Sequence, residues 1–91
     1  MSRATGNTQT TIPFDLPEAG TVEMHVTDMN GRNVCQLMSG MMPAGSHRMV
    51  WHGQNDVGRQ VKSGAYFITL RARLGRADHE QVATRKVVLM K

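Results

Sequence analysis

The chain has 91 residues, of which 40% are hydrophobic and 20% are charged, and its formal net charge is +4 at pH 7. A chain of this size forms one domain with a usable core, and no apolar run is long enough to span a bilayer. Only 4% of the residues are aromatic. This argues against nucleic-acid binding, which needs stacking aromatics or a known module beside a basic surface.

The chain begins with small polar residues, MSRATGNT, over residues 1–8. They are predicted to be a linker or a cloning remnant that precedes one β-domain over residues 9–91. They contain no apolar segment typical of a signal peptide. The first strand is expected over residues 10–16, where apolar and polar residues alternate. Pro13 lacks a backbone N–H, so this strand should lie at a sheet edge or carry a bulge.

A hairpin is predicted next. Residues 22–27 alternate between apolar and polar side chains, which indicates a strand with one face toward solvent. The pair Asn30-Gly31 follows, and Asn-Gly is the strongest short hairpin signal because both residues tolerate positive φ. A third strand is expected over 33–38, and the Gly- and Pro-containing segment 39–45 is interpreted as a connection.

The stretch from Trp51 onward is predicted to organise the core. Trp51 ends the fourth strand, and a polar loop with a short fifth strand at 60–62 leads to the most regular strand, over 65–74. Alternate residues of that strand share one face. We expect Trp51 and this face to form the central core contact. The predicted core residues are Phe14, Val26, Trp51, Tyr66, Ile68 and Leu70.

The last strand is expected over residues 80–90, with Val87 and Leu89 facing inward. About seven short strands, with turns about every 8–12 residues and no helical period, predict an all-β fold, an antiparallel β-sandwich. The final strand has apolar residues flanked by basic ones. It could simply complete the sandwich, or it could also pair with another sheet through its main chain.

No catalytic site is predicted, and the chain is interpreted as not an enzyme and without a cofactor. The serines fall in turns or in the N-terminal tail, and no G-x-S-x-G or H-E-x-x-H motif is present. Ser46 and His47 are adjacent on a strand, so their side chains point to opposite faces. The single cysteine, Cys35, excludes an internal disulfide and is expected to be a small buried hydrophobe.

Two ligand-binding alternatives remain open. Asn55 and Asp56 form a weak calcium candidate, but one carboxylate is too few for tight binding, and turn formation is the favoured interpretation. No other metal site is predicted. Carbohydrate binding would need exposed aromatic side chains, and only Phe67 is predicted to face away from the core.

Five sequence landmarks occur in order: TTIPFDLPEAG, V-x-M-x-V-x-D-x-N-G-R-x-V, PAGSHRMVWHG, N-D-V-G-R-x-V-x-S-G-A-Y-F-I-x-L and ATRKVVLMK. This order resembles the immunoglobulin-like domain of flagellar hook-capping proteins. It is still more similar to the C-terminal sorting domains of the type IX secretion system. His52, where Asp is frequent after the Trp, and Asn55 beside Asp56 depart from the family pattern and weaken a calcium site.

The resemblance implies an immunoglobulin-like sandwich that is a non-catalytic C-terminal sorting and attachment module of a secreted or cell-surface protein exported through the periplasm. Its implied partners are an outer-membrane secretion translocon, sortase-like components and an upstream catalytic or adhesive domain of the same precursor. The alternative is an accessory spacer or ligand-binding module, including carbohydrate binding and hook-cap-like assembly. The implied recognition strand comprises Lys86, Val87, Val88, Leu89, Met90 and Lys91.

Overall fold

The computed structural model describes residues 9–75 and 79–90, so the predicted linker lies outside it. All of its regular elements are strands, and no helix in the described part is long and apolar enough to cross a membrane. The predicted all-β class is therefore confirmed. The six strands are β1 (Thr10–Leu16), β2 (Gly20–Thr27), β3 (Asn33–Met42), β4 (Gly45–Trp51), β5 (Gly64–Leu74) and β6 (His79–Leu89).

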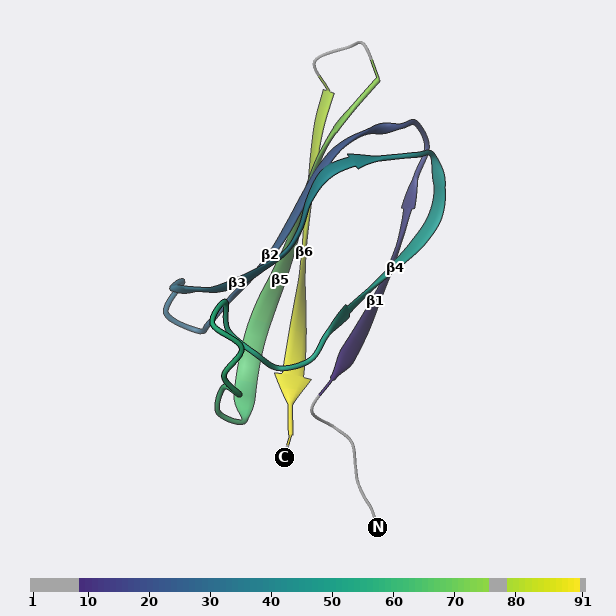
Figure 1. Ribbon diagram of the computed structural model, residues 1–91. Coiled ribbons are helices and arrows are strands. Elements are labelled where there is room, and N and C mark those ends of the chain that lie inside the picture. The colour runs from purple at the N-terminus through teal and green to yellow at the C-terminus, as the bar shows by residue number, and fades with distance from the viewer. Residues whose placement is uncertain (1–8, 76–78, 91) are drawn as a thin grey trace.

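The strands form two antiparallel sheets that face one another (Figure 1). One sheet has two strands, in the order β1-β4, and the other has four, in the order β3-β2-β5-β6. Each strand places alternate side chains between the sheets, as the burial pattern of β2 shows most clearly. The predicted antiparallel sandwich is thus observed, and Pro13 lies in an edge strand, as expected.

Two segments differ from the sequence expectation. The strand predicted at 60–62 is reduced to one isolated bridge between Gln54 and Gln60. The third strand continues to Met42 instead of ending near residue 38. Ser39 and Gly40 suggest a turn, but their main chain stays paired with the first half of β2, and a register shift beside Met24 accommodates the longer strand.

The core consists of two adjoining clusters between the sheets. Among the predicted core residues, Val26, Trp51, Tyr66 and Ile68 are buried. Phe14 and Leu70 are only partly buried and pack against both clusters. The remaining buried members are Ile12, Leu16, Val22, Met24, Cys35, Ala72, Leu74, Val87 and Leu89.

The contact between Trp51 and Tyr66 joins the two sheets at one end of the core. The ring centroids lie 5.1 Å apart at an interplanar angle of 67°, an edge-to-face arrangement. The Trp51 Nε1–H donates to the carbonyl oxygen of Gln54 at 3.0 Å, and the Tyr66 hydroxyl donates to the carbonyl oxygen of Lys62 at 2.6 Å. The two rings therefore also fix both ends of the loop between β4 and β5.

We expect Trp51→Ala to lower the free energy of unfolding by about 3–5 kcal/mol, because it opens a large cavity and releases the loop. Urea unfolding followed by circular dichroism measures this change. Val57→Ala is a suitable control, since Val57 is 77% exposed and its truncation should cost less than about 0.5 kcal/mol. A loss below about 1 kcal/mol for Trp51→Ala would contradict the assignment of this contact as central.

Candidate functional site

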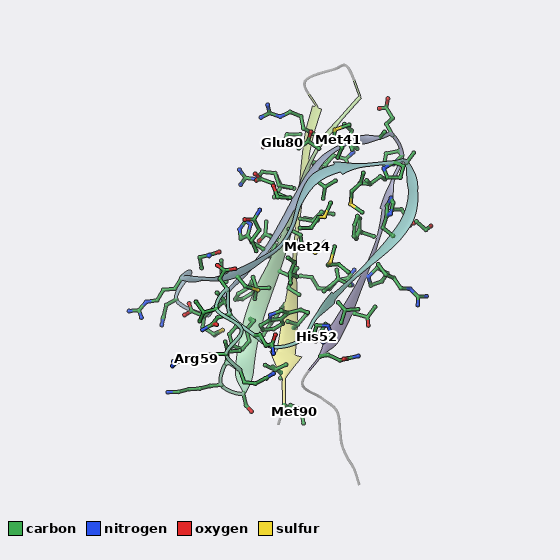
Figure 2. All side chains as sticks on the ribbon, in the orientation of Figure 1. Met24, Met41, His52, Arg59, Glu80 and Met90 are labelled. Atoms are coloured by element: carbon green, nitrogen blue, oxygen red, sulfur yellow. The ribbon has the colours of Figure 1, made fainter. Side chains whose placement is uncertain are left out.

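The two turns at 28–32 and 55–59 share one architecture. Each begins with Asp or Asn, and that side-chain oxygen accepts hydrogen bonds from the main-chain N–H groups of the third and fifth residues, at 2.9–3.1 Å. The fourth residue is glycine with positive φ, 81° at Gly31 and 84° at Gly58, and its N–H donates to the carbonyl of the first residue. Both turns present an exposed arginine at the fifth position, one of which is Arg59 in Figure 2.

The turn at 55–59 also binds the outer edge of β3. The Asp56 N–H donates to the carbonyl oxygen of Val34 at 3.3 Å, and the Gln36 N–H donates to the Asp56 carboxylate at 3.0 Å. This contact covers part of an otherwise open sheet edge. This contact was not predicted from the sequence. The shared spacing of Asx, Gly and Arg in the two turns is a signal that would have shown that the turns are alike.

The calcium candidate is placed in this same turn. The Asn55 side-chain oxygen accepts from two main-chain N–H groups, and one oxygen of Asp56 accepts from Gln36. These oxygens are thus used to hold the turn. Within residues 9–75 and 79–90, no group of three His, Cys, Asp or Glu side chains is arranged to hold a metal ion.

The aromatic side chains do not form a platform for sugar rings. Trp51 and Tyr66 are buried, and Phe14 is partly buried and packs on the His47 ring, with a centroid distance of 5.4 Å. Phe67 lies on the outer face of the four-stranded sheet and is partly buried, opposite Lys86 of β6. One half-buried ring offers little area for stacking.

Cys35 lies in the core beside the Trp51–Tyr66 contact. Burial, together with the nearby Asp56 carboxylate, raises the pKa of the Cys35 thiol above the ordinary value of 9.0, and the Trp51 side chain offsets part of this rise. Burial and Asp28 likewise raise the pKa of Tyr66 above 10.0. A buried thiol with a raised pKa is a poor nucleophile.

The predicted recognition strand coincides with the second half of β6. Val87 and Leu89 are buried, while Lys86 and Val88 are exposed on the outer face. Met90 follows the strand and is 58% exposed, and Lys91 lies outside the described residues. The strand therefore completes the core with one face and leaves the other face accessible.

An open groove of about 370 Å³ runs between the end of β1 and the first half of β6. Asp15 and Leu16 line it from one sheet, and Gln81 and Ala83 line it from the other. Gln81 and Ala83 lie on the same face of β6 as Val87 but are exposed.

These features define an immunoglobulin-type β-sandwich with hydrogen-bonded turns, an accessible edge strand and shallow surface hollows. The model of the FlgD Ig-like domain family matches residues 1–75. The chain therefore belongs to this family. No curated protein gives a significant match.

Two solved structures share the fold. One is FlgD from Xanthomonas campestris, whose structure is described in terms of the hook capping essential for flagellar assembly. It is 26% identical to this chain, with a TM-score of 0.70 over 90% of this chain. FlgD from P. aeruginosa is 20% identical with a TM-score of 0.64 over 88% of this chain. The chain covers 58% and 60% of those two chains, respectively.

These matches correct the predicted partners. The expected secretion translocon and sortase-like components belong to the type IX sorting interpretation. The family model is instead that of the FlgD Ig-like domain, and both solved structures are FlgD proteins, one of them described in terms of hook capping. The error arose because the ordered landmarks describe a sandwich and its turns, which the two kinds of domain share. The terminal basic and apolar residues describe an accessible edge strand and do not specify its partner.

We expect Gly31→Ala and Gly58→Ala to destabilise the fold by similar amounts, about 1–2 kcal/mol each, because a Cβ disfavours the left-handed conformation. Nothing lies within 4 Å of a Cβ built at either glycine, so the cost is conformational rather than steric. Asn tolerates this conformation better, so Gly31→Asn and Gly58→Asn should cost less. Urea unfolding of the four variants tests this, and an equal loss for Asn and Ala would contradict it.

The raised pKa of Cys35 predicts how stability depends on pH. The folded state holds the thiol proton more tightly than the unfolded state, so this contribution is fully present below pH 9.0 and is lost as pH rises through the folded pKa. As pH rises into the alkaline range, the free energy of unfolding of Cys35→Ala should therefore fall less than that of the wild-type protein. Both proteins keep the loss that follows from the raised pKa of Tyr66. Parallel pH profiles for both proteins would show that Cys35 makes no such contribution.

Proposed function

We propose that this chain is the immunoglobulin-like module of a flagellar hook-capping protein and acts in hook assembly as a non-catalytic structural element. The observation that carries the proposal is the family match over residues 1–75, which takes in β1 to β5. The 26% identity to the FlgD of X. campestris, a hook-capping protein, supports the same assignment.

The physical character of the described surface agrees with a role in assembly. Several of its polar side chains are held by hydrogen bonds: Asp28 and Asn55 organise their own loops, Asp56 binds the β3 edge, and the Asp15 carboxylate accepts from the Ser46 hydroxyl across the β1–β4 pair at 2.6 Å. Side chains committed in this way give rigid surfaces for docking, which is what a capping structure needs from its modules.

The module extends over residues 9–91 in this proposal, with 1–8 as a linker. Because the chain covers only about three-fifths of the two solved FlgD chains, the cap would need further parts. In this proposal the module functions outside the cytoplasm after export.

Deletion of the coding sequence in the source organism tests the proposal. We expect cells without hooks and without motility, scored by electron microscopy and swimming assays, and full restoration by the wild-type gene. Cells that keep normal hooks and full motility after the deletion would overturn the proposed function.

Two variants sharpen the complementation. Val57→Ala changes an exposed side chain and should restore hooks fully, whereas Trp51→Ala should restore them poorly because the sandwich is destabilised. Immunoblots of both variants show how much of each protein accumulates, so poor restoration at a normal protein level would be assigned to the altered fold and not to low abundance.

A further inference from the structure

Two edge strands of the sandwich carry features that hinder pairing with another chain. β1 contains Pro13, which has no N–H to donate. The outer edge of β3 is bound by Asp56 through Val34 and Gln36. Natural sheets use such devices to prevent edge-to-edge association.

Within the described residues, the outer edge of β6 carries charged side chains but is neither interrupted by a proline nor covered by a hydrogen-bonded turn. β6 is 11 residues long, contains neither Gly nor Pro, and pairs with β5 in an unbroken register from Gly64↔Leu89 to Leu74↔His79. Among the described strands it pairs with β5 alone. A long regular edge of this kind is a template for another strand.

We propose that β6 pairs with β6 of a second copy of this chain, antiparallel, about a twofold axis at Ala83. The two four-stranded sheets would then join into one continuous sheet, an isologous contact in which each copy offers the same surface. This proposal goes beyond the hook-cap function and does not depend on it, since β6 lies after the segment that matches the family model.

The charges on the outer face of β6 select this register. With the axis at Ala83, Glu80 of each copy lies directly opposite Lys86 of the other, which gives two symmetric pairs of opposite charge. Glu80 is then flanked by Lys86 of the second copy and by Arg73 of its own chain, which it already contacts at 3.7 Å.

Among the residues that the structure describes, other registers lack this match. An axis at Glu80, Arg85 or Lys86 places identical charges opposite each other, which is destabilising. An axis at Thr84 places Lys86 opposite Val82 and leaves both lysines without an opposite charge. The charged residues of β6 therefore favour one register of pairing with a second copy, and they disfavour pairing with unrelated strands.

The uncharged positions also fit. In this register Val82, which is 53% exposed, lies opposite Thr84 of the second copy, a pair with good strand propensity. On the other face, Arg85 of the second copy lies beside Gln81, at the groove that Asp15 lines from β1. The groove thus has room for the Arg85 side chain of the second copy, and the Asp15 carboxylate offers it an opposite charge. Figure 2 shows Glu80 toward the hairpin end of β6 and Met90 at its opposite end.

Sedimentation equilibrium of the purified 91-residue chain tests the pairing. We expect a monomer–dimer equilibrium, with Glu80→Lys and Lys86→Glu each weakening the dimer by roughly tenfold or more, because each replaces two attractive pairs by two repulsive ones. An equimolar mixture of the two variants should regain dimers. In the mixed dimer, each of the two pairs formed by positions 80 and 86 again joins opposite charges. A variant that had merely unfolded could not be rescued in this way.

Controls and a second measurement complete the test. Arg48→Glu reverses an exposed charge on β4, in the other sheet, and should leave the dimer unchanged. Under mild oxidation, Ala83→Cys should form a covalent dimer across the axis, whereas Val88→Cys, exposed on the same strand, should not. A chain that stays monomeric up to millimolar concentration, or a mixture of the charge variants that shows no gain over either alone, would overturn the proposal.

Discussion

The edge-to-face contact of Trp51 and Tyr66 is where the two sheets and the longest described loop are held together. Trp51 ends β4 in the small sheet, and Tyr66 lies near the start of β5 in the large one, so the ring contact closes the sandwich at that end. The polar atoms of the same rings hold the loop at Gln54 and Lys62. Because that loop carries the turn that binds β3, the protection of one sheet edge depends on the same pair of rings.

Much of the fold could be predicted from the sequence because alternation of apolar and polar residues has a direct geometric meaning in a strand. The hairpin at Asn30-Gly31 and the buried Trp51 followed from such local signals. The extension of β3 through Gly40 could not, since glycine signals a turn in isolation and only pairing with β2 keeps it in the sheet. The partial burial of Phe14 and Leu70 was equally hidden, because it depends on how far the small sheet extends over the large one.

The candidate surfaces were less predictable than the fold. The residue types of Asn55 and Asp56 suit both a cation and a turn, and the choice between these depends on main-chain N–H groups that have no sequence signature. The terminal strand was recognised as accessible from its composition, yet composition says nothing about which protein meets it. Partner identity depends on the shape and register of a whole edge, and the matched positions of opposite charge on β6 become visible only once the strand order is known.

Because of the order of strands along the chain, the entropic cost of loop closure differs between the strand pairings. The hairpins β2–β3 and β5–β6 join neighbours in sequence, so each closes a short loop. β1 and β4, in contrast, enclose the whole of β2 and β3 between them, and Thr10 must meet Trp51 to complete their ladder. Loop-closure entropy grows with the length of the enclosed chain, so the two-stranded sheet carries a larger such cost than either hairpin while making a shorter ladder. Burial of the Trp51 indole at the end of this sheet offsets part of that cost.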